Sequence, residues 1–204
     1  MLTLYQSPAS PYVRKVLVLL HETGQLDSVT LKSSTGTALE PGSLPLDINP
    51  LGKIPTLERD DGCALHDSRV ICRFLAERAA QGPQLYPEAP RLWEVLTLEA
   101  TAEGILDAAV PMRYEMALRP LDRQWPEWLD AQWSKIARSL DVLESRWMGH
   151  LYGPLCMGQI ATACALGYLD FRHDARNWRE DHDALAAWYA RFAERPSMLA
   201  TVPA

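Results

Sequence analysis

The stretch of sequence that decides the fold is Ser7-Pro8-Ala9-Ser10-Pro11-Tyr12-Val13-Arg14-Lys15. It follows the alternating, strand-like residues Leu2–Gln6 and opens an apolar helical pattern from Pro11 to Thr23, with Pro at a first helical position. A hydroxyl at such a junction lies beside backbone N–H groups without helical partners and beside the positive end of the helix dipole, so an anion placed there is stabilised. Ser10 is therefore predicted either to cap the helix only or to face an anionic ligand as well.

The residues that follow predict a small α/β unit. The long polar stretch Ser33–Asn49 shows no clear pattern and leaves room for a short helix. The remaining elements complete the order βαβ followed by ββα: strands at Ser28–Lys32, Thr56–Arg59 and Cys63–Leu65, the turn Asp60-Asp61-Gly62 between the last two, and a final helix that Asp67 and Ser68 open and that runs to about Arg78.

Two further segments of this unit are candidates for ligand binding. Asn49-Pro50-Leu51-Gly52-Lys53-Ile54-Pro55-Thr56-Leu57 places a proline at the start of a strand. It is either a simple strand entry or a cis bond that turns the Ile54 backbone N–H and C=O toward an extended ligand. In Leu65-His66-Asp67-Ser68-Arg69-Val70-Ile71 the acid and the hydroxyl either cap the helix or form a site for a zwitterion. In such a site helix N–H groups and Ser68 bind a carboxylate, and Asp67 binds an ammonium group.

The second half of the chain is predicted to be helical, and all seven tryptophans lie in it. The breaker-rich segment 81–90 is expected to link a first domain at 1–80 to an all-helical domain at 91–204. The helical patterns are an early helix, including Leu92 to Ala109, that Pro111 bends or ends; a core stripe at Leu129, Trp133, Ile136, Leu140, Leu143 and Trp147; a helix from about Met157 to Asp170; and a last helix with Leu185, Trp188 and Phe192 that stops at Arg195-Pro196.

The composition excludes several functional classes. With 48% apolar residues the chain is globular, and a net charge of −6 argues against a nucleic-acid binder. The longest mostly apolar stretch, Ile160–Leu169, falls short of the roughly 20 residues that cross a bilayer. Because no secretory signal is visible, we expect a cytoplasmic protein, with no membrane partner and with reduced thiols. The cysteine and histidine spacings predict no metal site.

Three segments together, Ser10-Pro11-Tyr12-Val13, Gly52-Lys53-Ile54-Pro55 and Asp67-Ser68, resemble in order and spacing the glutathione S-transferase family, especially its small bacterial members. The resemblance covers nearly the whole chain, because Arg119-Pro120 and Gly167–Arg172 also have counterparts in the helical half of that family. It implies a thioredoxin-like N-terminal domain, with a cis-proline before its third strand, followed by an α-helical bundle. It also implies a homodimer that uses glutathione as a co-substrate, with no cofactor and no metal.

The resemblance also assigns roles to the residues of the first half. Ser10-Pro11-Tyr12-Val13 stands where glutaredoxins carry two cysteines, so a dithiol mechanism is not available at this position. The family's serine-type members use this hydroxyl to stabilise the glutathione thiolate, which makes Ser10 the catalytic residue, with Ser7 as the alternative. Four residues are implied to bind glutathione: Ile54 by its backbone at the cysteinyl part, Lys53 near the glycyl carboxylate, and Asp67 and Ser68 at the γ-glutamyl end.

For the second substrate, a small hydrophobic electrophile, the resemblance indicates Tyr12, Arg113 and Tyr114, with Arg119 nearby, although ordinary interdomain pairing is the favoured interpretation of Arg113, Tyr114 and Arg119. A non-catalytic binding or regulatory protein on the same scaffold is the main alternative function, and a glutathione-dependent thiol reductase is disfavoured by the missing cysteine. The chain departs from the family pattern twice. Asp67 replaces a glutamate, and Cys156-Met157-Gly158-Gln159 replaces a Ser or Thr with Asp three residues on. Gln159 can still reach back as a capping-box partner, but Cys156 is a poor N-cap, which predicts a weaker helix cap.

Overall fold

The computed structural model describes residues 2–204, which form two compact units. The first unit contains the residues up to Tyr86 together with Pro196–Ala204, and the second contains Pro87–Arg195. The first is an α/β unit and the second is helical, so the predicted fold class, a thioredoxin-like domain followed by a helical domain, is confirmed. The last nine residues differ from the sequence-based division, because they group with the first unit.

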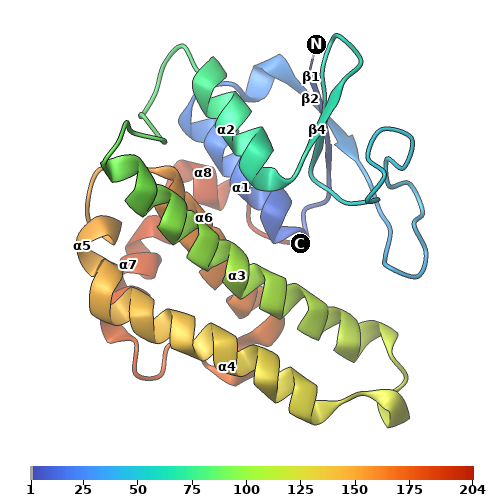
Figure 1. Cartoon of the computed structure of the whole chain (residues 1–204), viewed down its shortest axis with the longest axis vertical. Helices are drawn as coiled ribbons and strands as arrows, with labels where there is room; N and C mark the ends of the chain where they lie inside the picture. Colours follow the sequence, from blue (N-terminus) through green and yellow to red (C-terminus); the bar gives the residue numbers. More distant parts are fainter. Residues whose placement is uncertain (1) are drawn as a thin grey trace. The chain divides into compact units, whose positions relative to one another are not determined.

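The first unit is built on a four-stranded sheet in the order β2-β1-β3-β4. β1 and β2 are parallel, as a helical crossover between them allows, whereas β3 pairs antiparallel with both β1 and β4. Helices α1 and α2 pack against each other beside this sheet (Figure 1). The elements are β1 Leu2–Gln6, α1 Pro11–Glu22, β2 Val29–Ser33, β3 Thr56–Glu58, β4 Ala64–His66 and α2 Ser68–Arg78.

The core of this unit follows the predicted periodicities. Leu4 of β1 and Leu57 of β3 are opposite each other in the sheet and are fully buried. Val16 and Leu20 of α1 and Leu75 of α2 are equally buried, as expected for the apolar faces of two helices on one sheet. This packing fixes where each strand ends, and therefore where the connecting loops begin.

The polar stretch between β2 and β3 contains turns and no helix, so the short helix that the sequence allowed is absent from it. Close backbone contacts explain why. A Cβ atom added at Gly36 would lie 2.3 Å from the carbonyl oxygen of Pro41, and one added at Gly42 would lie 2.3 Å from that of Thr35. The stretch is thus folded back on itself at two glycines, a conformation that a helix could not adopt.

The last residues of the chain belong to the first unit because they hold both ends of α1. Helix α8, Pro196–Leu199, packs on α1. Arg14, which is buried in the first turns of α1, donates a 3.1 Å hydrogen bond to the carbonyl oxygen of Met198. At the other end of α1, the Ser197 hydroxyl donates to the carboxylate of Glu22.

The second unit is arranged around α6, which is buried at every position from Met157 to Leu169. α3 packs against both α6 and α4, and α3 and α4 form the long helical hairpin seen in green and yellow in Figure 1. The helices are α3 Arg91–Leu118, α4 Pro126–Val142, α5 Met148–Leu151, α6 Met157–His173 and α7 Asp183–Ala193.

Two long helices of this unit form where their sequence patterns predict them, and each has one local feature that the patterns left open. Pro111 lies inside α3 and does not end it, because the neighbouring Ala109 and Met112 are buried and this packing offsets the hydrogen bond that proline cannot donate. The apolar stripe that begins at Leu129 is helical throughout. Its last part, Leu143–Trp147, winds as one wide π-helical turn, a common form of local bulge.

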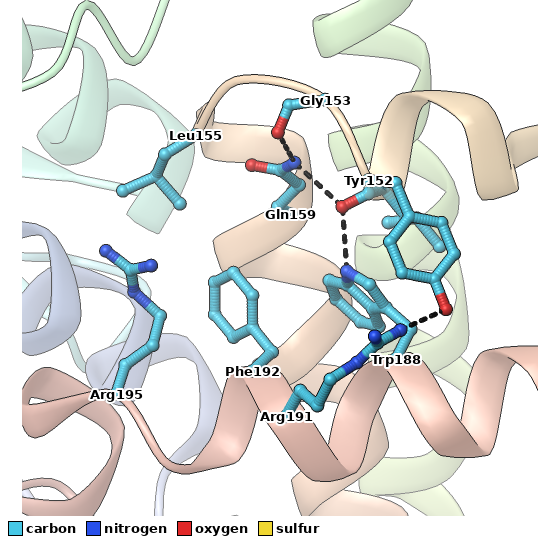
Figure 2. Close-up of a pocket in the computed structure, with 9 residues that line it drawn as sticks. Tyr152, Gly153, Leu155, Gln159, Trp188, Arg191, Phe192 and Arg195 are labelled. Carbon is cyan, nitrogen blue, oxygen red and sulfur yellow. Dashed lines mark hydrogen bonds between the residues drawn. The ribbon is translucent and has the colours of Figure 1, made fainter.

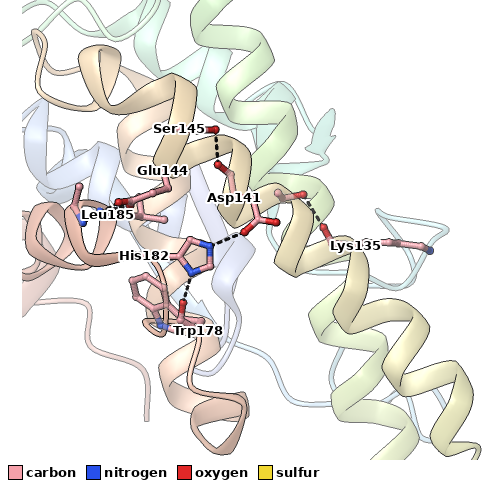
Figure 3. Close-up of polar contacts among 9 residues, drawn as sticks. Lys135, Asp141, Glu144, Ser145, Trp178, His182 and Leu185 are labelled. Atoms are coloured by element: carbon pink, nitrogen blue, oxygen red, sulfur yellow. Dashed lines mark hydrogen bonds and ion pairs between the residues drawn. The ribbon is translucent and has the colours of Figure 1, made fainter.

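The N-terminus of α7 is capped by a side chain from outside the helix. Glu144, which lies in the π-helical turn, accepts hydrogen bonds from the backbone N–H groups of Ala184 at 3.0 Å and Leu185 at 2.7 Å. The buried His182 precedes α7 and lies between the Trp178 carbonyl oxygen at 2.8 Å and the Asp141 carboxylate at 3.0 Å (Figure 3). These contacts tie the start of α7 to the end of α4.

The contact predicted for Gln159 as a capping-box partner is present at the start of α6, and further hydrogen bonds of its side chain strengthen the cap. Gln159 Oε1 accepts a 2.8 Å hydrogen bond from the Cys156 backbone N–H, and Gln159 Nε2 lies within 3.1 Å of three carbonyl oxygens, those of His150, Leu151 and Gly153. Gln159 therefore forms hydrogen bonds that the shorter aspartate of the family pattern could not reach. Burial raises the pKa of the Cys156 thiol, which is consistent with a structural role for this cysteine.

Candidate functional site

Ser10 lies at the junction between the first strand and the first helix. Its backbone is extended, Pro11 occupies the first helical position, and the Ser10 Oγ accepts a hydrogen bond from the Val13 backbone N–H at 3.3 Å. The backbone N–H of Ser10 in turn donates to the Ser7 carbonyl oxygen at 3.1 Å. A hydroxyl that accepts from a helix still has its own hydrogen to donate, so the cap and a ligand contact are compatible. Ser7 is half-buried in the same turn.

The second candidate segment is held in shape by a buried asparagine. The Ile54-Pro55 bond is cis, which confirms that expectation. Asn49, fully buried, donates to the Lys53 carbonyl oxygen at 2.9 Å and to the Thr56 hydroxyl at 3.0 Å. Among residues 2–204, the backbone N–H and C=O of Ile54 have no hydrogen-bond partner, so both groups are available to a ligand. The Lys53 side chain is exposed to solvent.

Asp67 and Ser68 open α2, as predicted. Asp67 has a φ of +72°, and its Oδ1 caps the helix by accepting from the Arg69 backbone N–H at 2.9 Å. Its carboxylate also forms a two-point ion pair with the Arg69 guanidinium, at 3.1 and 2.7 Å. The Arg69 contact holds the pKa of the Asp67 carboxyl below its usual range, so this group is an anion at neutral pH. Ser68 is the first helical residue and is buried.

The sheet register brings these three segments to one edge. Tyr5 of β1 lies opposite Thr56 of β3, which lies opposite His66 of β4. The chain leaves β1 just after Tyr5, enters β3 at Thr56 and leaves β4 at His66. The Ser7–Ser10 loop, the cis-proline turn and the start of α2 therefore emerge from the same end of the sheet. This end carries the positive ends of two helices, a free backbone edge at Ile54 and several hydroxyls.

The residues proposed for a second substrate are divided between the two units. Tyr12 lies half-buried in α1 of the first unit. Arg113 and Tyr114 lie in the last turns of α3 in the second unit, beyond Pro111. Near them, burial raises the pKa of Tyr168 to about 12, and the charges of Arg172 and Arg113 partly oppose this shift. Arg119 is paired within its own helix end, at 2.7 Å from the Glu115 carboxylate.

Sequence reasoning missed Asn49 and Arg69. Asn49 stands at the start of the cis-proline motif, and Asn at the edge of a Pro-Gly turn is a common local hydrogen-bonding residue, which is the signal that could have identified it. Arg69 comes two residues after Asp67, and this spacing gives no sign that its side chain folds back onto the carboxylate. Within the described chain, no three His, Cys, Asp or Glu side chains gather as metal ligands. Of the helices in residues 2–204, none is long and apolar enough to span a membrane.

Comparison with known proteins agrees with this architecture. The model of the glutathione S-transferase N-terminal domain matches residues 9–78, and that of the C-terminal domain matches residues 126–191. The GST-like protein YibF of Escherichia coli is 34% identical over 97% of this chain and 96% of its own length. The chain belongs to the glutathione S-transferase family. Glutathione S-transferase 3 of Zea mays, another relative, is 30% identical over 100% of this chain and 94% of its own length.

Solved structures of the glutathione S-transferase family match the whole chain. A family member from Pseudomonas fluorescens Pf-5 with bound glutathione is 50% identical, with a TM-score of 0.97 and complete coverage of both chains. A structure of a Pf-5 family member with bound S-(propanoic acid)-glutathione has a TM-score of 0.93 at the same identity and coverage. In these relatives, glutathione or a derivative substituted at sulfur is bound to a chain of this fold.

Proposed function

We propose that this protein is a glutathione transferase in which Ser10 stabilises the thiolate of bound glutathione. The observation that carries the proposal is the register Tyr5, Thr56 and His66, which gathers Ser10, Ile54 and Asp67-Ser68 at one end of the sheet. A tripeptide laid across this end meets a hydroxyl donor, a free backbone pair and a helix N-terminus. Glutathione bound to a 50%-identical family member supports the choice of ligand.

The required shift in the pKa of the thiol is within reach of this geometry. A free thiol has a pKa near 8.5, so only a few per cent is ionised at pH 7. Lowering that pKa by about 2 units requires roughly 2.7 kcal/mol of preferential stabilisation of the thiolate. One hydrogen bond to a charged sulfur contributes about 1.5–3 kcal/mol, and the N-terminus of α1 adds about 0.3–1 kcal/mol. The hydroxyl of Ser10 and the start of α1 together suffice, and the thiol proton is lost to solvent. The thiolate sulfur then bonds to the electrophilic carbon while a halide leaves, an epoxide C–O bond opens, or a C=C π bond breaks and its other carbon takes up a proton.

The remaining contacts are distributed over the three residues of glutathione. The N–H and C=O of Ile54 pair with the cysteinyl backbone, and the exposed ammonium of Lys53 lies toward the glycyl carboxylate. Ser68 and the first N–H groups of α2 bind the γ-glutamyl carboxylate. Asp67 binds the γ-glutamyl ammonium through the lone pair that Arg69 and the helix cap leave unused, because a carboxylate offers about four acceptor positions.

The second substrate is a small hydrophobic electrophile, for which Tyr12, Arg113 and Tyr114 are the proposed contacts. The sulfur-substituted glutathione bound to a Pf-5 family member supports testing unsaturated acids beside halogenated aromatics, epoxides and peroxides. The proposal also includes a cytoplasmic homodimer that uses no metal or other cofactor. A chelator should accordingly leave turnover unchanged, and sedimentation should give twice the mass of one chain.

The decisive experiment follows the ultraviolet absorbance of the bound thiolate against pH. The wild-type thiol pKa should lie about 2 units below that of free glutathione. In Ser10→Ala the pKa of the bound thiol should rise most of the way back to that of free glutathione, whereas Ser7→Ala should titrate like the wild type. S-methylglutathione, which has no ionisable thiol, provides the binding control and should bind wild type and Ser10→Ala with similar affinity.

Three outcomes would change the conclusion. An unaltered titration in Ser10→Ala would exclude the proposed catalytic role. A shift in Ser7→Ala alone would transfer the role to Ser7. Binding of glutathione with a lowered thiol pKa but no turnover across the electrophile panel would favour the non-catalytic binding protein.

A further inference from the structure

Two arginines of the second unit lack a counter-charge. Arg113 lies in the last turns of α3 and Arg172 near the end of α6, and both side chains are half-buried. Among residues 2–204, neither guanidinium group forms a hydrogen bond or an ion pair. Arg172 lies over the Phe171 ring, 3.8 Å from its centre. Charged groups that leave water are normally paired, so these two guanidinium groups indicate a place for an anion.

Four other arginines of this unit do have partners. Arg191 of α7 donates to the Tyr152 hydroxyl, as Figure 2 shows. The other three form ion pairs of 2.8 Å or less: Arg119 with Glu115, Arg176 with Asp130, and Arg179 with Asp170. These carboxylates are already neutralised, so they do not supply the counter-charge that Arg113 and Arg172 lack.

A buried phenol lies beside the two unpaired arginines. Tyr168 comes one helical turn before Arg172 on the same face of α6, and its side chain is only 4% exposed. Within the described chain its hydroxyl has no hydrogen-bond partner, yet it is not among the polar atoms that are sealed from solvent. Burial raises the pKa of Tyr168 to about 12, against the charges of Arg172 and Arg113, so the phenol keeps its proton at neutral pH. It is therefore a free donor at the edge of the core.

Contacts between α3 and α6 place Arg113 at the same end as this pair. Near the start of α6, a Cβ atom added at Gly158 would lie 2.9 Å from the Leu98 side chain of α3. Further along, the His173 Nε2 lies 2.9 Å from the Ala109 carbonyl oxygen. The two helices therefore run parallel. Arg113, one turn after Ala109, lies level with the end of α6.

We propose that Arg113, Arg172 and Tyr168 bind a carboxylate carried by the electrophile, so that the preferred second substrate is an apolar molecule with one acidic end. This inference rests on the proposed function, in which Arg113 already contacts the electrophile. The guanidinium groups offer paired N–H donors to a carboxylate, and the phenol adds an O–H donor.

Halogenated aromatic acids and unsaturated acids are the substrates that this cluster favours. With the first, the glutathione sulfur bonds to the ring carbon and a halide leaves. With the second, the sulfur bonds to one alkene carbon, the C=C π bond breaks, and the other carbon takes up a proton from water. In both cases the carboxylate itself is unchanged, so it can remain bound to the cluster throughout the reaction.

The test compares two glutathione adducts that differ at one end. S-(2-carboxyethyl)glutathione has a terminal carboxylate, and S-propylglutathione, of the same length, has a methyl group in its place. In isothermal titration calorimetry on the full chain at pH 7, wild type should bind the acid at least tenfold more tightly than the propyl adduct. Arg113→Met and Arg172→Met should each reduce this preference several-fold, and the double variant should abolish it. Arg138→Met, which changes an exposed arginine on α4, is the matched control and should keep it.

Tyr168→Phe removes only the hydroxyl and should lower the preference by about threefold. Conjugation rates provide a second measurement, with 4-chloro-3,5-dinitrobenzoate and its neutral amide as substrates. Arg113→Met should raise the KM for the benzoate much more than the KM for the amide. Thermal unfolding of each variant verifies that it is folded.

Two results would overturn the inference and leave the proposed function intact, because both adducts contain glutathione. One is equal affinity of wild type for the two adducts. The other is an unchanged preference in the double arginine variant. If wild type bound neither adduct, the proposed glutathione site would be wrong, and the inference would be overturned with it.

Discussion

The side-chain nitrogen of Asn49 lies 2.9 Å from the carbonyl oxygen of Lys53, so a buried amide fixes the residue that precedes Ile54. The same nitrogen lies 3.0 Å from the Thr56 hydroxyl, which itself donates to the Lys53 carbonyl at 2.8 Å. Asn49 Oδ1 accepts from the Leu51 backbone N–H at 3.1 Å. Four hydrogen bonds that involve the Asn49 side-chain amide or the Lys53 carbonyl oxygen therefore hold the cis-proline turn in shape.

Asn49→Ala should lower the free energy of unfolding by about 2–3 kcal/mol, because it removes a fully buried side chain, leaves the Lys53 carbonyl with one partner fewer and opens a small cavity. It should also raise the KM for glutathione, since the Ile54 backbone is no longer held. Urea unfolding and steady-state kinetics check the two effects. Thr56→Val, which removes only the hydroxyl of the same network, should show a smaller loss. A loss below about 0.5 kcal/mol in Asn49→Ala would contradict the interpretation.

Gln159→Glu should destabilise the second unit strongly although it conserves size. The change replaces an amide nitrogen that donates to the carbonyl oxygens of His150, Leu151 and Gly153 by an anionic oxygen that repels them. We expect a loss of about 3 kcal/mol or more in urea unfolding, because the new charge is buried without a donor. Gln132→Glu, on the accessible part of α4, is the control and should be nearly neutral. Similar losses in the two variants would argue against a special role for Gln159.

Glu144 is expected to stabilise α7 although it lies outside that helix. Glu144→Ala removes the acceptor of the Ala184 and Leu185 N–H groups and should cost about 1–2 kcal/mol. Glu144→Gln keeps one acceptor oxygen but loses the charge that the helix dipole favours, so an intermediate loss is expected. Urea unfolding gives both values, and Glu180→Gln, an exposed loop carboxylate, serves as the control. If Glu144→Ala were no worse than the control, the cap would contribute nothing measurable.

His173 should make stability depend on pH in the mildly acidic range. Its ring is buried, its Nε2 donates to the Ala109 carbonyl oxygen at 2.9 Å, and burial lowers its pKa below the ordinary value of 6.5. Below pH 6.5 the unfolded chain takes up a proton that the folded chain does not, so stability is full above pH 6.5. It falls as the pH is lowered toward the folded-state pKa, by at most about 1.4 kcal/mol per pH unit.

His173→Gln keeps an N–H donor for the Ala109 carbonyl and removes the titration. The stability difference between pH 7 and pH 5, measured by urea unfolding at both values, should therefore be smaller in the variant than in the wild type. An identical difference in the two proteins would show that His173 does not titrate differently on folding.

The sequence predicted well those features that depend on local chemistry. Ser10 and Asp67 are helix caps, and a cap is a property of a few consecutive residues. The family resemblance carried by the ordered motifs implied the cis bond before Pro55, which the residues alone left open. What the sequence could not show was how side chains fold back over loops, as Asn49 does in the cis-proline turn and Arg69 does on Asp67. Neither contact has a periodicity or a composition that marks it.

Tertiary packing accounts for the other differences. A proline such as Pro111 would end or bend an isolated helix. In α3 the flanking residues are buried against neighbouring helices, and this packing lets the helix continue. Cys156 is a poor cap by itself, and the sequence predicted only that Gln159 reaches back to its backbone N–H, whereas Gln159 also donates to the His150, Leu151 and Gly153 carbonyl oxygens. The cluster that Arg113 forms with Tyr168 and Arg172 combines two separate helices, so only the folded chain reveals it.

The hydrogen bonds of Arg14 with Met198 and of Glu22 with Ser197 affect the order in which the two units can fold during synthesis. A ribosome translates from the N-terminus, so α1 is made before residues 197 and 198, its partners, which follow the whole helical unit. We therefore expect the half that carries Ser10 to mature last, after the helical half, and a fragment ending at Tyr86 to lack part of its native support.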